Sequence, residues 1–261
     1  MRNEIEVLFI GDVIGAPGRE ALQQFLKGRQ TDFTIVNGEN LAGGVGITPK
    51  IAEEVFDLGV DAITTGNHVW KKKEIVPYIE IQQRLLRPIN YPDDAPGRGY
   101  ALLEKNGKRL YVVNVEGRVF MSPLLCPFRS MERLMSELEG DVPVVVDFHA
   151  EATSEKIAMG WFLDGRVSAV IGTHTHVQTA DERILPLGTG YITDIGMTGP
   201  SDSVIGMRKE SVIRRFLTQI PQRFEVAKGR VEVQGVRIRI DASTKRCVAI
   251  ERIRKEMGEI D

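Results

Sequence analysis

The stretch VSAVIGTHTH (167–176) joins a short apolar run to two closely spaced histidines. Most of five further runs share its design, an apolar segment that ends in Gly, Asp, Asn or His. These runs are apolar at nearly every position, which is typical of strands buried on both faces of a sheet. They are EVLFIGD (6–12), FTIVNGEN (33–40), DAITTGNH (61–68), VVVDFHAE (144–151) and YITDIG (191–196).

Helical patterns separate the first of these runs. PGREALQQFLKG (17–28) opens with a proline suited to a first helical turn and closes on a glycine. TPKIAEEVFDLG (48–59) offers Thr48 as the N-cap, Pro49 at the first helical position and Gly59 as the stop. Alternation of strands and helices predicts an α/β layered fold.

The centre and the C-terminal part follow a different pattern. GYALLEKNGKRLYVVNVEG (99–117) predicts two strands joined by a type I′ turn at Asn106 and Gly107. Residues 223–253 alternate with period two, which predicts antiparallel strands that complete a sheet. A mixed sheet or a two-sheet core covered by helices accommodates both patterns. No boundary divides the chain, so we expect residues 1–261 to form a single domain.

The composition is that of an ordinary globular protein. Of the 261 residues, 42% are hydrophobic and 27% are charged, and the formal net charge is −2. This charge gives no general attraction to nucleic acid or to an anionic membrane. No stretch approaches the roughly 20 apolar residues of a membrane span, and none resembles a signal peptide. Cys126 and Cys247 lie far apart in the sequence, so we expect two buried thiols in a reducing, cytoplasmic environment. Because there is no apolar span, we expect no membrane partner.

Polar residues with metal-ligand chemistry follow the predicted strands. Ligand sites in open α/β sheets lie beyond the carboxyl ends of strands, and all four histidines of the chain stand at such ends. His174 and His176 share one side if their segment is extended, so the pair can aim at one point. The candidate site residues are Asp12, Glu39, Asn40, Asn67, His68, His149, His174 and His176.

The residue types indicate which ions such a site would bind. Imidazole, carboxylate and amide oxygen without thiolate suit Mn, Fe, Zn or similar ions. The candidates outnumber the four ligands of one tetrahedral zinc, and two metals that share a carboxylate would use them all. Paired metals clamp the attacking and leaving oxygens of an in-line displacement at phosphorus. Because only Asp12 and Glu39 are anionic, a bridging hydroxide and a phosphodiester monoanion would neutralise two divalent ions, which favours diesters over dianionic monoesters.

Several longer motifs resemble a known family. The chain is similar to the YmdB family of calcineurin-like metallophosphoesterases, over about Glu6 to Ile253. The motifs are FIGDVIG (9–15), NGEN (37–40), GNHVW (66–70), FHAEATSEK (148–156), GTHTHVQTADERILP (172–186) and TDIGMTGP (193–200). The resemblance implies a four-layer αββα sandwich, with mixed sheets flanked by helices. It also implies a phosphodiesterase acting on 2′,3′-cyclic nucleotides or related small diesters, and indirect partners in bacterial RNA turnover.

The resemblance also implies a role for each candidate residue. Two divalent or trivalent metal ions are expected, with Fe favoured over Mn or Zn, and a metal-bridging hydroxide as nucleophile. His68 is the expected general acid facing the scissile phosphate. The first-metal ligands are Asp12, Glu39, Asn40 and His176, and the second-metal ligands are Glu39, Asn67, His149 and His174, with Glu39 bridging.

One motif departs from the wider superfamily. The first motif of the superfamily usually reads GD-x-H, whereas Val13 and Ile14 follow Asp12 in this chain. In addition, Glu39 stands where the broader group commonly has an Asp. Both differences agree with the YmdB branch, and they leave the identity and affinity of the first metal open.

Two other functions are compatible with the sequence. A metal-dependent amidohydrolase also carries an H-x-H pair, although there the pair ends the first strand of a barrel. A regulatory or RNA-associated protein could carry a structural or weakly catalytic metal site, and a homo-oligomer is compatible with either function. Trp70 could stack on a base or pack internally, and Arg118 could contact substrate or form a surface ion pair.

Overall fold

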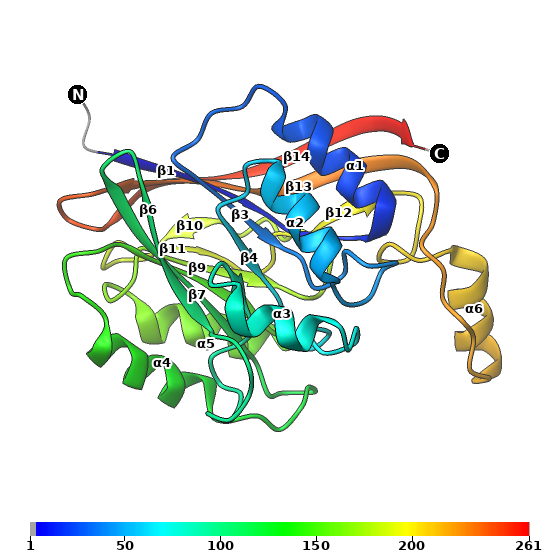
Figure 1. Cartoon of the computed structure of the whole chain (residues 1–261), viewed down its shortest axis with the longest axis horizontal. Coiled ribbons are helices and arrows are strands. Elements are labelled where there is room, and N and C mark those ends of the chain that lie inside the picture. Colours follow the sequence, from blue (N-terminus) through cyan, green and yellow to red (C-terminus); the bar gives the residue numbers. More distant parts are fainter. Residues whose placement is uncertain (1–3, 261) are drawn as a thin grey trace.

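The computed structural model describes residues 4–260, and it contains two β-sheets and six α-helices (Figure 1). The first sheet has eight strands and mixes parallel with antiparallel pairs. Its strands are β1 (Glu4–Ile10), β2 (Asp12–Val13), β3 (Phe33–Asn37), β4 (Ala62–Thr64), β5 (Leu85–Leu86), β12 (Met197–Pro200), β13 (Gly229–Asp241) and β14 (Cys247–Ile260), in the order β2-β12-β13-β1-β3-β4-β5 with β14 beside β13.

The second sheet has six strands and is also mixed. Its members, in spatial order, are β10 (Arg183–Ile184), β11 (Gly190–Ile192), β9 (Ala169–Thr173), β8 (Val144–His149), β7 (Lys108–Glu116) and β6 (Tyr100–Lys105). The H-x-H pair follows β9, an inner strand of this open sheet, and not the first strand of a barrel. The amidohydrolase alternative is therefore wrong.

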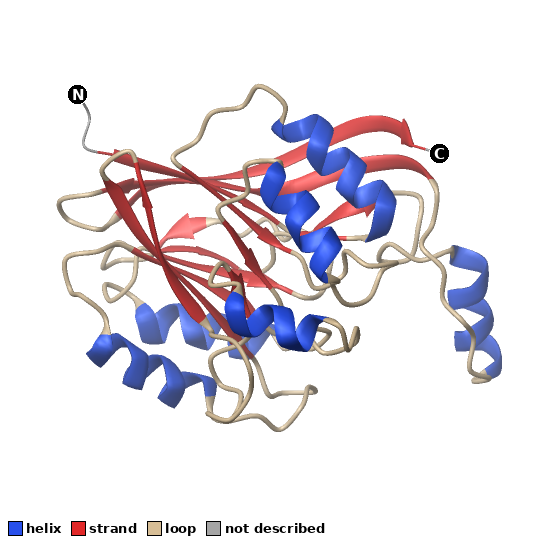
Figure 2. Cartoon of the chain, in the orientation of Figure 1, coloured by secondary structure: helices blue, strands red, loops and turns tan. Residues whose placement is uncertain are grey.

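Helices cover the outer faces of the two sheets (Figure 2). One group lies over the first sheet and another under the second, while the last helix projects from one end of the molecule (Figure 1). No helix within residues 4–260 combines the length and apolar character needed to cross a membrane. The helices are α1 (Gly15–Leu26), α2 (Pro49–Asp57), α3 (Ile75–Ile81), α4 (Pro127–Glu137), α5 (Thr153–Leu163) and α6 (Lys209–Thr218).

Three hydrophobic clusters hold the layers together. Along β1, Val7 and Phe9 point between the sheets, whereas Leu8 and Ile10 point toward the helices. Successive side chains of a strand alternate between its faces, so a strand apolar at every position is buried on both. A third cluster joins the second sheet to α4 and α5. Three cores between four layers confirm the predicted αββα sandwich.

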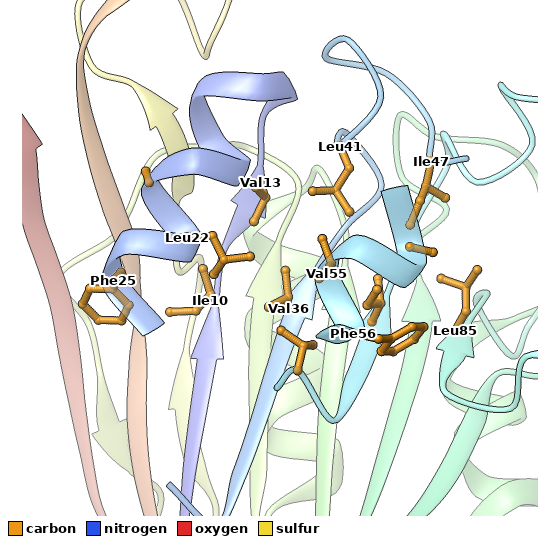
Figure 3. Close-up of a cluster of buried hydrophobic side chains, with 14 of the residues drawn as sticks. Ile10, Val13, Leu22, Phe25, Val36, Leu41, Ile47, Val55, Phe56 and Leu85 are labelled. Carbon is orange, nitrogen blue, oxygen red and sulfur yellow. The ribbon is translucent and has the colours of Figure 1, made fainter. Parts of the chain in front are cut away.

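The cluster above the first sheet shows how the helices are attached (Figure 3). Leu22 of α1 and Val55 of α2 point toward Ile10 and Val36 on the sheet. All four are essentially inaccessible to solvent. Burying a side chain of this size contributes about 1.5–3 kcal/mol, so this packing fixes the strand–helix junctions that carry the site.

Local predictions from the sequence are confirmed at several points. The Thr48 hydroxyl accepts a hydrogen bond from the Ile51 amide at 3.3 Å and caps α2. The β6–β7 turn has positive φ at Asn106 and Gly107, as a type I′ turn requires. The C-terminal strands β13 and β14 pair antiparallel. Both cysteines are free and Cys247 is buried, but the expectation of a buried thiol is wrong for Cys126, which is half-buried just before α4.

Candidate metal centre

The carboxyl ends of strands from both sheets meet at one edge of the sandwich. In the first sheet β1, β3 and β4 run parallel, and in the second β7, β8 and β9 do so. Glu39 and Asn40 follow β3, Asn67 and His68 follow β4, and His149 ends β8. Asp12 begins β2 just past β1, and the H-x-H pair follows β9. The contacts described next join the side chains of all eight candidates into one connected set.

Glu39 is the hub of this set. Its side chain is buried, and its Oε1 lies 3.3 Å from His149 Nε2 and 3.2 Å from His68 Nδ1. Asn40 Nδ2 donates to the same oxygen at 3.2 Å. The His68 amide donates to Glu39 Oε2 at 3.0 Å. One carboxylate thus contacts neighbours from both sheets.

One half of the set surrounds Asp12. Its Oδ1 is buried, accepts no hydrogen bond from any residue in 4–260, and lies 3.8 Å from His176 Nε2. Asn40 Nδ2 lies 3.3 Å from that same nitrogen. A buried carboxylate oxygen without a donor is costly unless a cation compensates it, so this half of the set fits a metal ion.

The other half surrounds His149. Its Nε2 lies 3.2 Å from Asn67 Oδ1 and 3.0 Å from His174 Nδ1, and the two rings are 4.7 Å apart at 75°. Ligand atoms of Glu39, His149 and His174 all lie within 4.8 Å of one another. Two imidazole nitrogens facing one carboxylate oxygen form the donor set that borderline divalent ions prefer.

Outer contacts direct one nitrogen of each of three histidines, His149, His174 and His176, toward the cluster. A metal-bound histidine commonly donates its other ring N–H to an oxygen, which fixes the tautomer. Every imidazole of the proposed ligand set has such a partner. The pairs are His149 Nδ1 with Thr173 Oγ1 at 2.8 Å, His174 Nε2 with Glu151 Oε2 at 3.2 Å, and His176 Nδ1 with the Ile205 carbonyl at 3.0 Å.

Electrostatics draw positive charge into this cluster. Burial opposes ionisation of Glu39, but His149 and His68 outweigh it and hold the pKa of Glu39 well below its usual value. Burial also disfavours charged His149, yet Glu39 and Asp12 raise the pKa of His149 to about 10. Burial and then His149 lower the pKa of His174 to about 3. The buried carboxylates therefore favour positive charge at the point where the ligand atoms converge.

The expected geometry of the H-x-H pair is wrong. Strand β9 ends at Thr173, and His174 and His176 have φ values of 100° and 63°, so the pair does not lie in an extended segment. The two rings reach different halves of the cluster, His174 toward His149 and His176 toward Asp12. In this curved segment the His174 amide donates to Asp12 Oδ2 at 3.2 Å.

Two residues beside the site have roles that the sequence left open. Trp70 packs edge-on against Tyr91 with ring centroids 5.8 Å apart, next to the helix-side core, which supports internal packing over base stacking. The Arg118 amide donates to the Glu155 carboxylate, while its side chain is exposed. Neither residue belongs to the connected set.

Sequence reasoning missed Glu116, the last residue of β7. It pairs in register with His149, is fully buried, and neither of its carboxylate oxygens has a hydrogen-bond partner among the described residues. Asn90 holds its backbone through hydrogen bonds of 2.8 and 2.9 Å. Burial raises the pKa of Glu116 to about 7. The signal was present in VVNVEG (112–117), a mainly apolar run that ends at a polar residue, as the other site strands do.

Replacing Glu116 by Gln is expected to stabilise the protein at pH 8.5 but not at pH 5. A carboxyl with a raised folded-state pKa contributes stability below its unfolded pKa of 4.5, and this contribution is lost as pH rises through about 7. The gain at high pH is at most roughly 3 kcal/mol. Urea unfolding of both proteins at both pH values, with chelator present, measures it. Glu137→Gln, an exposed substitution on α4, is the control, and an equal gain at both pH values would contradict the assignment.

Comparisons with known proteins place this geometry in a family. The chain is 52% identical to a 2′,3′-cyclic-nucleotide 2′-phosphodiesterase of Bacillus subtilis, over 95% of this chain and 96% of that protein. A crystal structure of a hypothetical protein from Thermus thermophilus superposes with a TM-score of 0.90 at 43% identity, covering 97% of this chain and 99% of that one. A phosphatase structure from Mycoplasma pneumoniae gives a TM-score of 0.92 at 37% identity, covering 99% and 96%. The model of the YmdB-like protein family matches residues 8–253, and the chain therefore belongs to that family.

Proposed function

We propose that this protein is a dinuclear metal-dependent phosphodiesterase that hydrolyses 2′,3′-cyclic nucleotides or related small diesters. The observation that carries the proposal is the position of Glu39, whose carboxylate lies between two sets of ligand-type side chains. The name of the Bacillus subtilis relative supports the substrate class, since that protein shares half of its residues with this chain.

The two sets divide as the family resemblance implies. Asp12, Glu39, Asn40 and His176 would hold one ion, and Glu39, Asn67, His149 and His174 would hold the other. Nitrogen and oxygen donors without thiolate suit Fe, Mn or Zn, with Fe favoured by the resemblance. When bound, the ion pair would supply an ionised water at neutral pH and positive charge for the transition state of phosphoryl transfer.

His68 supplies the proton in this proposal. Its Nδ1 is engaged by Asn40 Oδ1 at 2.9 Å and by Glu39, so Nε2 is left to protonate the leaving ribose oxygen. Its side chain is 29% exposed, whereas that of Glu39 is only 1% exposed, so the ring can meet a substrate entering from solvent. Histidine is the commonest residue for such proton transfer because it exchanges protons near neutral pH.

A substrate panel tests the proposed function. With two anionic ligands, Asp12 and Glu39, two divalent ions retain net positive charge that a hydroxide and a diester monoanion neutralise. We expect hydrolysis of 2′,3′-cyclic nucleotides and of a generic diester to exceed that of a phosphomonoester. Activity should vanish with a chelator and return with Mn²⁺ or Fe²⁺, with bound metal quantified in parallel. Hydrolysis of the monoester alone would contradict the charge argument.

A regulatory or RNA-associated role with a structural or weakly catalytic metal site stays the alternative. Stoichiometric metal with negligible turnover of every diester would favour it over the phosphodiesterase. The RNA-turnover partners, a homo-oligomer, the single domain and the cytoplasmic location stay predictions.

A further inference from the structure

A buried ion pair contacts the loop that carries His174 and His176. Lys156 on α5 and Asp194, just past β11, are both buried, and Lys156 Nζ lies 2.7 Å from Asp194 Oδ2. Removing two charges from water costs several kcal/mol per ion, so such a pair gives little net stability compared with apolar residues. Neither side chain belongs to the proposed ligand sets or to the proton transfer.

The pair forms hydrogen bonds with the residues on both sides of His174. Lys156 Nζ donates to the Thr173 carbonyl at 2.7 Å. Asp194 Oδ2 accepts from the Thr175 amide at 3.0 Å and from its hydroxyl at 2.8 Å. Asp194 Oδ1 accepts from the Gly196 amide at 2.8 Å, which fixes the carboxylate itself. The backbone before and after His174 is therefore tied to one buried pair.

The loop that is held in this way has an unfavourable backbone. His174 and His176 have φ values of 100° and 63°, in the region that favours glycine. Non-glycine residues there cost about 1–3 kcal/mol each, and they persist only where surrounding contacts enforce them. Without those contacts the loop would relax toward ordinary φ values, and the two imidazoles would turn away from their halves of the cluster.

We propose that Lys156 and Asp194 are positioning residues that hold His174 and His176 in the strained conformation needed to bind the metal pair. This inference rests on the proposed metal centre and concerns how the chain builds it. Its consequence is that metal affinity depends on two residues that contact neither ion. Outer contacts that orient metal ligands are typically worth 10–100-fold in affinity.

The test compares Mn²⁺ binding and thermal stability in four variants of the 261-residue chain. Lys156→Met and Asp194→Asn remove the pair, and Thr175→Val removes one hydrogen bond to Asp194 while keeping the branched side chain. Met159→Ala is the matched control. Met159 is a buried residue of the same helix α5, and its side chain makes no hydrogen bond to residues 173–176. Equilibrium dialysis gives the Mn²⁺ affinity and stoichiometry, and thermal unfolding in chelator gives stability.

We expect Lys156→Met and Asp194→Asn to weaken Mn²⁺ binding by about 10–100-fold. Thr175→Val should weaken it less, with little loss of thermal stability, and it remains informative if the buried variants fail to fold. Met159→Ala should lower thermal stability but leave Mn²⁺ affinity unchanged. If Thr175→Val and every folded variant of Lys156 or Asp194 bound Mn²⁺ with wild-type affinity, the positioning role would be overturned. The proposed metal centre would not be affected by that result. Failure of the wild-type protein to bind Mn²⁺ or Fe²⁺ would overturn the metal centre and the inference with it.

Discussion

Replacing His68 by Ala is expected to lower the turnover of a 2′,3′-cyclic nucleotide by about 10²–10⁴-fold, the usual contribution of a positioned general acid. Bound metal should stay at the wild-type level, because His68 is not among the proposed ligands. Its ring is held at Nδ1 by Asn40, and its amide donates to Glu39, so the ring is placed beside the centre. Loss of metal in this variant would make His68 a ligand and contradict its assignment as the acid.

The choice of leaving group separates proton donation from other roles of His68. A diester of p-nitrophenol releases a stable anion that needs little protonation, whereas a ribose oxygen leaves poorly without a proton. His68→Ala should therefore impair p-nitrophenyl diester hydrolysis far less than cyclic nucleotide hydrolysis. An equal loss with both substrates would indicate that His68 positions Glu39 or Asn40 and does not donate the proton. Parallel kcat and KM values, with metal content, complete the comparison.

The fold could be predicted because its signals are local. Runs that are apolar at every position, such as VLFI (7–10) at the end of β1, can be buried only between two layers. The Thr48 cap and the Asn106–Gly107 turn depend on neighbouring residues alone, so their chemistry is readable from the sequence. The division of the strands between two sheets was harder to predict from the sequence. It depends on pairings such as that of β1 with β13, whose residues are more than 200 positions apart.

The candidate site was predictable as a set but not in its conformation. The carboxyl ends of parallel strands meet at one edge of a sheet. The sequence alone therefore predicted that the polar residues after each apolar run would lie together in one site. The curved path of His174 and His176 could not, because it depends on Asp12, Lys156 and Asp194, which are remote in sequence. An i, i+2 argument assumes an extended backbone and fails where distant hydrogen bonds impose another one.

Replacing Glu39 by Gln is expected to abolish phosphodiesterase activity and to remove at least one of the two proposed metal ions. Glu39 contacts His149 and lies beside Asn40 and His68, so a change at this residue affects both ligand sets together. Glutamine keeps the size and one carbonyl oxygen but removes the anionic charge, leaving Asp12 as the single anionic ligand for two cations. Metal analysis of the purified variant, with turnover of a 2′,3′-cyclic nucleotide, measures both effects.

Glu116→Gln is the matched control for this variant. Both residues are fully buried carboxylates at the carboxyl end of a site strand, yet Glu116 lies outside the proposed ligand sets. The same chemical change at Glu116 should leave two ions bound, so a loss specific to Glu39→Gln isolates the bridging role. If Glu39→Gln retained two ions at wild-type affinity, another group would have to join the two metal sites. The dinuclear assignment centred on Glu39 would then be wrong, even if the protein remained a phosphodiesterase.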